Sequence, residues 1–213
     1  MYLPEHFEEG RVEELHRIIN EYPFGTLVTQ SPNGLDANHL PFILEKKHSA
    51  AGTLLAHVAR ANPIWRLCTD GDTVLVIFQA ADAYISPNWY PSKPETRRHV
   101  PTWNYQVVHV HGRITIRDDD TFVRGVVGRL TAVHEAHANP ETPWKMTDSS
   151  KEYIDQMVQA IVGIEIEITK MVGKFKLSQN REDRDRIGAA ENLRKHGEQI
   201  ISSAMLNAKQ QGK

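Results

Sequence analysis

The stretch from Ala83 to Gly112 carries the side chains best suited to bind a flat ligand. Its two halves, Tyr84–Tyr90 and Val100–Gln106, interleave tryptophan and tyrosine with serine, threonine, asparagine and glutamine. Aromatic rings offer area for stacking, and amides and hydroxyls can form hydrogen bonds with the edge of a planar ring system. Between the halves, Lys93–His99 is a short basic cluster that suits a phosphate. The alternative is a proline-stiffened loop that packs its aromatics for stability, and the residues alone leave both interpretations open.

A second candidate lies at the turn from His57 to Pro63. The end of a strand, Arg60, and then Asn62 and Pro63 at the start of a short helix follow one another directly. A guanidinium beside free N–H groups at a helix start can bind an anion. The alternative is an ordinary strand-to-helix turn with a surface arginine, because this spacing is only weakly specific.

The eleven histidines raise the question of a metal site. His109 and His111 share a strand face, and His134 and His137 lie one helical turn apart, so either pair could supply ligands. Neither pair has the HExxH spacing, and the single cysteine, Cys68, offers no thiol pair. We therefore expect no metal site and an inert thiol at Cys68. The sequence also contains no legible catalytic triad and no glycine-rich phosphate loop.

The elements that must position these residues are mainly strands. Apolar and β-branched runs predict them, with Ser31–Gly34 and Lys46–Gly52 as turns. The strands are expected at Phe24–Gln30, Leu35–Glu45, Thr53–Val58, Thr73–Gln79, Ala83–Ile85, Asn104–Ile116 and Ile161–Leu177, the last as one strand or as two broken at Gly173.

Helical spacing of apolar residues predicts the remaining elements. The helices are expected from Pro4 and Glu8–Glu9 to Tyr22–Pro23, at Pro63–Cys68, from Asp118–Asp120 to about His137, from Ser149 or Ser150 to about Gln159, and at about 182–210. Antiparallel-type strands without a β-α-β rhythm argue against a doubly wound sheet. We predict an α+β, mainly β fold: a small closed or split β-barrel with flanking helices, as one domain over residues 1–213.

Composition sets the broad class. The chain of 213 residues is 40% apolar and 24% charged, which is typical of a globular protein with one sizeable core. No apolar run approaches the roughly 20 residues of a membrane helix, and the first residues lack the pattern of a secretory signal. With a single cysteine, these features predict a cytoplasmic protein that does not enter a membrane.

Charge is unevenly distributed along the chain. Residues 170–213 hold ten Lys and Arg against five Asp and Glu, whereas residues 1–169 hold fifteen against twenty-two. The net charges are therefore about +5 and −7, from ten minus five and fifteen minus twenty-two. A basic tail can contact nucleic acid, although such a tail is more often a solvated helix face.

Six motifs, in order along the chain, resemble those of the PaiB family. They are Met1–Pro4 (MYLP), Asn38–Phe42 (NHLPF), His57–Asn62 (HVARAN), Tyr84–Tyr90 (YISPNWY), Val100–Tyr105 (VPTWNY) and Lys176–Arg181 (KLSQNR). That family is described as FMN-binding and as a group of negative transcriptional regulators, named for repression of protease synthesis and sporulation. The resemblance spans nearly the whole chain. It implies the FMN-binding split barrel of the pyridoxamine-phosphate oxidase-like flavoproteins, which are homodimers with FMN in a groove between the subunits.

The resemblance also implies a set of FMN-binding residues. The strand of Asn38 would lie beside the isoalloxazine, the turn of Arg60 and Asn62 would hold the phosphate, and the segment of Trp103 would come from the second subunit. The full set is Asn38, His39, Leu40, His57, Val58, Arg60, Asn62, Trp103, Asn104, Gln106, Lys176 and Arg181. The oxidases use an adjacent Arg-Lys pair at the phosphate turn, where this sequence has one arginine and an asparagine. That departure leaves haem or another flavin open as the ligand.

Three functions follow from these observations. The first is an FMN-binding homodimer that acts as a negative transcriptional regulator; no helix-turn-helix pattern is evident, and the basic C-terminal helix and Lys93–Arg98 are the electrostatic candidates for DNA contact. The second is a flavin-dependent oxidoreductase acting on a small substrate, with His39 and His57 as acid–base candidates. The third is a haem-binding protein of the same fold.

Overall fold

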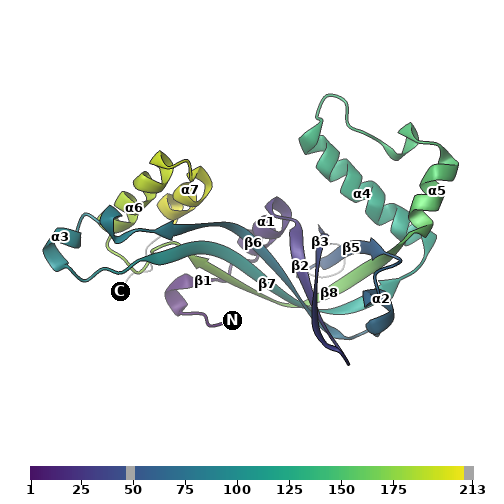
Figure 1. Ribbon diagram of the computed structural model, residues 1–213, viewed down its shortest axis with the longest axis horizontal. Coiled ribbons are helices and arrows are strands. Elements are labelled where there is room, and N and C mark those ends of the chain that lie inside the picture. The colour runs from purple at the N-terminus through teal and green to yellow at the C-terminus, as the bar shows by residue number, and fades with distance from the viewer. Residues whose placement is uncertain (47–50, 209–213) are drawn as a thin grey trace. The chain divides into compact units, whose positions relative to one another are not determined.

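The computed structural model describes residues 1–46 and 51–208 (Figure 1). Most of the expected turn at Lys46–Gly52, and the last residues of the helix expected at 182–210, lie outside the described residues. The chain divides into two compact units. One contains residues 16–78 and 109–171 and is called the barrel unit here, and the other contains residues 1–15, 79–108 and the chain from Val172 onward and is called the loop unit.

The sheet follows the predicted antiparallel pattern. Its hydrogen-bonded order is β3-β2-β6-β7-β8-β5-β4, and each pairing whose register is resolved is antiparallel. The strands are β2 (Phe24–Ser31), β3 (Gly34–Pro41), β4 (Ile43–Glu45), β5 (Thr53–Ala59), β6 (Thr73–Ile85), β7 (Thr102–Arg117) and β8 (Ile161–Lys176). The two ends of this order, β3 and β4, are consecutive pieces of chain separated only by the buried Phe42. The order therefore closes on itself, as in a split β-barrel.

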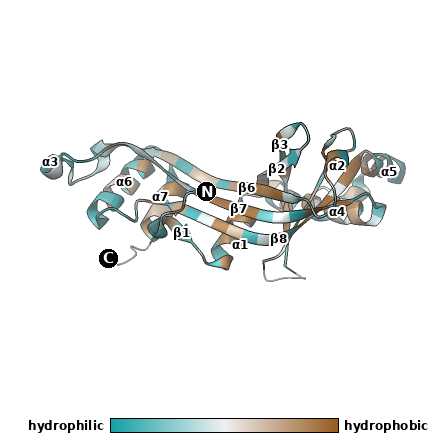
Figure 2. Cartoon of the chain, turned by 90° about the horizontal axis from the view of Figure 1, so that it is seen from below, coloured by the Kyte–Doolittle hydropathy of each residue, from teal (hydrophilic) through white to brown (hydrophobic). Residues whose placement is uncertain are grey.

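The barrel unit is built around alternating apolar residues. Along β5, for example, Leu54, Ala56 and Val58 are all buried on one face. The other face of β5 is covered by α4 (Asp120–Ala138), where Leu55 packs against Val126 and Leu130. Figure 2 shows the banding of hydrophobic and paler residues along β6 and β7 that this alternation produces.

The helices of the barrel unit begin where the sequence predicts. Asp119 caps α4, since its carboxylate accepts a hydrogen bond from the Phe122 N–H at 2.8 Å. Ser150 caps α5 (Lys151–Gln159) in the same way through Tyr153 N–H. The short helix α2 (Ile64–Leu67) follows β5, and Asn62 accepts a hydrogen bond from Ile64 N–H at 3.0 Å.

The loop unit contains the first fifteen residues, parts of the long strands β6, β7 and β8, and the helices that follow β8. The turn η1 (Glu5–Phe7) leads into β1 (Glu8–Glu9), which pairs with β8, and α1 (Val12–Glu21) begins in this unit. Between β6 and β7 lie only the short η2 (Pro87–Trp89) and α3 (Lys93–Thr96). The chain ends in α6 (Asp183–Lys195) and α7 (Gln199–Asn207), which lie side by side in Figure 1.

Several predicted boundaries were wrong, each for a local reason. The single helix expected at 182–210 is two helices, because Gly197 adopts φ +91° between them. The first helix starts at Val12 rather than at Pro4. Thr73–Gln79 and Ala83–Ile85 are one strand rather than two. Of the two alternatives for Ile161–Leu177, the single strand is confirmed, because β8 continues through Gly173, where a Cβ would lie 2.8 Å from Glu9 O. That glycine allows β1 to approach closely rather than ending the strand.

No helix within the described part of the chain has the length and apolar character needed to cross a membrane.

Candidate functional site

The twelve predicted ligand-binding residues fall into two groups, one in each unit. Seven belong to the barrel unit: Asn38, His39, Leu40, His57, Val58, Arg60 and Asn62. Five belong to the loop unit: Trp103, Asn104, Gln106, Lys176 and Arg181. Each group is described by itself.

In the barrel unit, Arg60 is held by partners of its own chain. Its guanidinium donates two hydrogen bonds to the carboxylate of Asp118, at 2.9 and 2.6 Å, in a bidentate pair. It also donates to the backbone oxygens of Gln159 and Ile161. The hydrogen bond from Arg60 keeps the pKa of Asp118 below its ordinary value. Four of the five N–H groups of this guanidinium thus already donate hydrogen bonds to oxygen atoms of Asp118, Gln159 and Ile161.

Asn62 has a similar bonding role. Its oxygen caps α2 at Ile64, and its amide donates to the side-chain oxygen of Asn38 at 2.6 Å. Asn38 in turn donates to Asp36. The structure therefore brings Asn38 and Asn62 together, as the predicted site requires, and fixes both amide groups through hydrogen bonds inside the unit.

The remaining members of the barrel group differ in exposure. Val58 is buried, whereas His39 is exposed and its ring stacks with Phe24 at 6.3 Å between centroids. His57 lies on the same face of β5 as Leu55, the face that α4 covers. Its Nδ1 is buried without a hydrogen-bond partner among the described residues, and burial lowers the pKa of His57. His57 is consequently a neutral imidazole at pH 7.

In the loop unit, Trp103 presents its ring to solvent. Its side chain lies on β7 beside Tyr84 of β6, with ring centroids 5.9 Å apart and planes at 73°. Trp103 is 55% exposed and Tyr84 is 46% exposed, which is unusual for rings of this size. The pair is an aromatic surface that a planar ligand can contact.

Two lysines of β8 contact residues of β7, the strand of Trp103. The ammonium of Lys176 donates to the hydroxyl of Thr102 and to the backbone oxygen of Trp103. Lys174 is buried, and its ammonium donates to Tyr2 O at 3.0 Å and lies over the rings of Tyr2 and Tyr105. Burial, and then the positive charges of Lys174 and Arg181, lower the pKa of Lys176. Sequence reasoning missed Lys174, although two lysines two residues apart on one strand share a face.

Arg181 packs over a buried tyrosine. Its guanidinium carbon lies 5.3 Å from the centre of the Tyr90 ring, and its Nη1 lies 3.5 Å from Nδ1 of His99. His99 itself lies within 2.8 Å of the hydroxyl of Ser92. This contact joins the motif of Arg181 to the loop between β6 and β7, both of which the sequence singled out.

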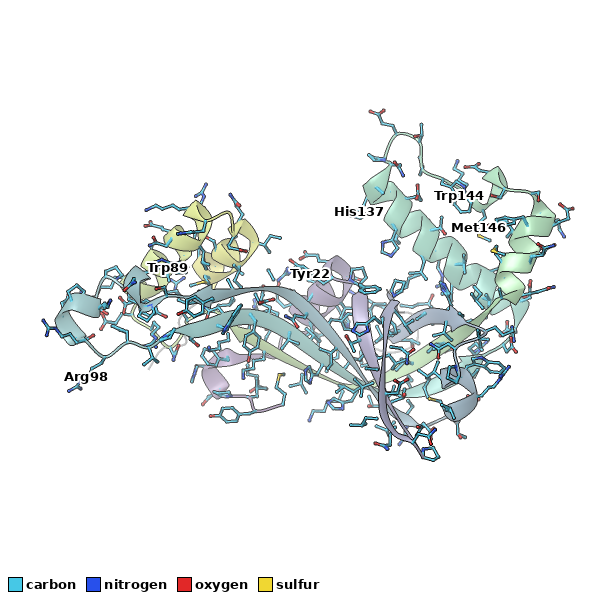
Figure 3. All side chains as sticks on the ribbon, in the orientation of Figure 1. Tyr22, Trp89, Arg98, His137, Trp144 and Met146 are labelled. Carbon is cyan, nitrogen blue, oxygen red and sulfur yellow. The ribbon has the colours of Figure 1, made fainter. Side chains whose placement is uncertain are left out.

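That loop is anchored by a buried carboxylate. Asp185 of α6 accepts hydrogen bonds from the backbone N–H and the hydroxyl of Ser92, at 3.0 and 2.6 Å. On the surface, Glu95 of α3 pairs with Arg184 through two hydrogen bonds. Figure 3 shows Arg98, two residues past the end of α3, directed away from the body of the loop. The proline-rich loop is therefore ordered by its contacts with α6, and its arginine tip is exposed.

Asn104 and Gln106 are buried on the inner face of β7. The amide of Asn104 donates to the hydroxyl of Ser178 at 2.8 Å, and within residues 1–46 and 51–208 its oxygen has no hydrogen-bond partner. Ser178, in the motif Lys176–Arg181, has a left-handed backbone with φ +66°. The strand alternation that places Val108 and Val110 inside also places these two amides inside, which the sequence could have indicated.

Comparison with known proteins places this geometry in a class. Residues 1–170 match the family model described as "Putative FMN-binding domain". Ten of the twelve predicted residues lie within that range, and Lys176 and Arg181 lie beyond it. The closed antiparallel order and the flanking helices are those of the split-barrel flavin-binding proteins, and FMN is the cofactor of this class.

Relatives define the family more narrowly. The chain is 34% identical over 193 residues to "Protease synthase and sporulation protein PAI 2" of Bacillus subtilis, covering 91% of this chain and 89% of that protein. It is 29% identical over 255 residues to an uncharacterized protein of Aspergillus fumigatus, covering 100% and 98% of the two chains. The chain belongs to the PaiB family of FMN-binding proteins.

Solved structures share the fold at low sequence identity. The FAD and haem binding protein of Mycobacterium smegmatis superposes with a TM-score of 0.58 at 16% identity, covering 85% of this chain and 79% of that one. The flavocytochrome Anf3 of Azotobacter vinelandii gives 0.57 at 10% identity, covering 79% and 69%. At these identities the likeness concerns the fold alone.

Proposed function

We propose that this protein is a homodimer that binds FMN in a groove between its subunits and acts as a negative transcriptional regulator in the cytoplasm. The observation that carries the proposal is the 34% identity with the sporulation protein of Bacillus subtilis over nearly the full length of both chains. The family model supports the flavin part independently of that relative.

Within this proposal, the predicted residues have different roles. The exposed Trp103 offers ring area, and Lys176 offers a cation beside it. Arg60 and Asn62 act by fixing the turn after β5, because their side chains already bind Asp118 and Asn38. Bound FMN supplies a redox-active, light-absorbing ring, whereas the side chains of the chain only bind and orient it.

Contact with DNA would come from a basic surface. Of the C-terminal pair, α7 contains no lysine or arginine, and on the basic helix α6 the guanidiniums of Arg184 and Arg186 are already paired with carboxylates. Arg97 and Arg98 at the end of α3 are exposed and are the better candidates. We propose that this tip contacts the phosphate backbone, which predicts binding that weakens steeply with salt.

The first test is the visible spectrum of the purified protein. An absorbance band near 450 nm and quenching of flavin fluorescence on titration with FMN are the results we expect for a flavoprotein. A Soret band instead of a flavin band would identify haem, and not FMN, as the bound cofactor. Light scattering on the eluting protein measures the oligomeric state, and a monomer at all concentrations would contradict the dimer.

The regulator itself is tested by electrophoretic mobility of labelled genomic fragments. Retardation that persists at roughly 0.15 M salt, and is weakened by Arg98→Ala, supports direct DNA binding. Lys151→Ala, at an exposed lysine of α5 in the barrel unit, is the matched control. If no fragment is retarded at any salt concentration, the regulatory role is not exerted through DNA contact by this chain.

The second candidate function is a flavin-dependent oxidoreductase acting on a small substrate. It is favoured by one observation, the exposed Tyr84–Trp103 pair beside a partly buried lysine, which is a surface that a small planar molecule can contact. Steady oxidation of NADH by the FMN-loaded protein in the presence of an electron acceptor would support it. A flavin that is reduced no faster than free FMN would exclude it.

A further inference from the structure

Two lysines in the loop unit bind neutral partners among the described residues. Lys174 is only 9% exposed, yet its ammonium binds a backbone oxygen and two aromatic faces rather than a carboxylate. Lys176 likewise binds a hydroxyl and a backbone oxygen. Within residues 1–46 and 51–208, the contacts that the structure gives for the two ammoniums are with neutral oxygens and aromatic rings. Buried charges are ordinarily paired, so this arrangement is costly unless an anion arrives from outside.

Neighbouring charges increase that cost. Lys174 and Arg181 both act on Lys176, and together with burial they hold the pKa of its ammonium below the ordinary value. The hydroxyl of Thr102 and the backbone oxygen of Trp103 hold the Lys176 side chain in place through hydrogen bonds. An anion at this position would restore the charge balance and would meet a positioned donor.

The same place offers an aromatic surface. Lys176 binds the backbone of Trp103, and the Trp103 ring forms an edge-to-face pair with Tyr84 at the surface. A cation fixed next to an exposed ring pair suits a planar molecule that bears an acidic group.

We propose that Lys176, supported by Lys174 and Arg181, binds the acidic group of a planar ligand whose ring lies against Trp103 and Tyr84. The inference rests on the proposed function, because FMN, a planar ring that bears a phosphate, is one ligand with this chemistry. A small aromatic acid that reacts with the bound flavin is the other ligand that combines a planar ring with an acidic group.

The turn after β5 is the competing place for a phosphate. There the guanidinium of Arg60 is already paired with Asp118, whose carboxylate is held ionised and would repel an incoming phosphate. The ammonium of Lys176 is instead hydrogen-bonded, within the described residues, to a hydroxyl and a backbone oxygen, both of them neutral. The charge balance therefore favours the lysine group over the turn.

The experiment compares an anionic ligand with its neutral counterpart. FMN and riboflavin, which differ in the phosphate, are titrated by calorimetry into the wild type and into Lys176→Met, Lys176→Arg and Lys170→Met. Lys170 is an exposed lysine of the same strand and serves as the control. In a second arm, phenyl phosphate is titrated into each protein, both without flavin and saturated with FMN.

We expect Lys176→Met to lower the affinity for either FMN or phenyl phosphate about ten- to a hundred-fold, because a charge-assisted hydrogen bond is lost. The affinity for riboflavin should change less than about two-fold. Lys176→Arg should retain most of the affinity, and Lys170→Met all of it. A loss for FMN identifies the flavin phosphate as the acidic group. A loss for phenyl phosphate on the FMN-saturated protein identifies a second ligand.

The inference is overturned if Lys176→Met leaves FMN and phenyl phosphate unchanged, or weakens FMN and riboflavin equally. It is distinguishable from the proposed function. If neither flavin binds the wild type, the proposed flavin binding is wrong, but phenyl phosphate without flavin still tests the lysine site. Binding of phenyl phosphate that Lys176→Met abolishes supports the site. Absence of phenyl phosphate binding to the wild type overturns it. A circular-dichroism spectrum and melting temperature equal to those of the wild type ensure that each variant is folded.

Discussion

Charged side chains in this protein differ in whether the fold supplies their counter-charge. Arg60 has Asp118, and Arg184 has Glu95 and Glu182. In the described part of the chain, Lys174 and Lys176 contact neutral oxygens, and Lys174 also contacts two aromatic rings. Sequence alone ranked Arg60 above the lysines, because an arginine at a strand-to-helix turn is a recognisable pattern. The ranking changes once the carboxylate brought in from residue 118 is known, since that partner is 58 residues away.

The Arg60–Asp118 pair predicts an acid-dependent loss of stability. The hydrogen bond from Arg60 lowers the pKa of Asp118 from 3.8, so the folded state binds this proton less tightly than the unfolded state does. The contribution is therefore fully present above about pH 3.9, and is lost as the pH falls through the lower folded value. We expect Asp118→Asn to lower the melting temperature at pH 7 by more than it does at pH 2.

The control for that prediction is Glu141→Gln, at an exposed carboxyl in the segment between α4 and α5. It should leave the melting temperature unchanged at both pH values. A difference between Asp118→Asn and the wild type that persists undiminished at pH 2 would mean that the ion pair is not its source.

His57 predicts a second pH dependence, at higher pH. Because burial lowers the pKa of His57 from 6.5, the unfolded state takes up this proton first as the pH falls. Stability from the neutral imidazole is present above about pH 6.5 and declines below it. We expect a proton NMR titration of the His57 ring to show a midpoint below 6.5, and His57→Phe to flatten the stability curve between roughly pH 5 and 6.5. A midpoint at or above 6.5 would contradict the burial.

At the scale of elements, close approach of strands is set by glycine. A Cβ at Gly112 of β7 would lie 2.4 Å from a methyl group of Ile166 and 2.6 Å from Glu167 O on β8. Because the second contact is with backbone, the neighbour cannot turn aside. We expect Gly112→Ala to lower the free energy of unfolding by roughly 1–3 kcal/mol, measured by urea denaturation.

Gly125 of α4 is the matched control, since a Cβ there meets nothing within 4 Å. Gly125→Ala should leave stability unchanged or raise it by up to about 1 kcal/mol, through helix propensity. Equal effects at the two positions would mean that β7 and β8 lie farther apart at Gly112 than the structure shows.

The loop between β6 and β7 depends on one carboxylate of α6. Asp185→Ala leaves the N–H of the buried Ser92 without its acceptor and removes one of the two partners of its hydroxyl, at a cost of about 1–3 kcal/mol. We expect amide hydrogens of Trp89, Lys93 and Glu95 to exchange faster in this variant, as measured by mass spectrometry. Glu95→Gln, which alters only the exposed pair with Arg184, should change exchange far less. Unchanged exchange in Asp185→Ala would show that other contacts order the loop.

Much of the element order could be predicted from the sequence, and less of the site. The strand Asn104–Ile116 and the helices after Asp119 and Ser150 carry local signals, namely alternation and caps, and all were confirmed. The break at Gly197 was missed because the apolar stripe continues on both sides of it. The contacts of Ser92 with Asp185, 93 residues apart, have no local signal at all.

At the scale of the whole molecule, the proposed groove between subunits links two equilibria. If FMN contacts residues of both subunits, binding must strengthen dimerisation by the same factor by which dimerisation strengthens binding. A site contained in one subunit would produce no such coupling. Sedimentation velocity across a protein dilution series, with and without saturating FMN, measures the factor directly.

We expect FMN to lower the dimer dissociation constant by about five- to 150-fold, the usual range of coupling between sites. Riboflavin separates the contribution of the phosphate from that of the ring. Because the phosphate is proposed to bind Lys176, the variant Lys176→Met should reduce the effect of FMN to that of riboflavin, while Lys170→Met should leave it intact. A dissociation constant that FMN does not change, in a protein that binds FMN, would place the flavin within a single subunit and would contradict the shared groove while leaving the flavoprotein itself intact.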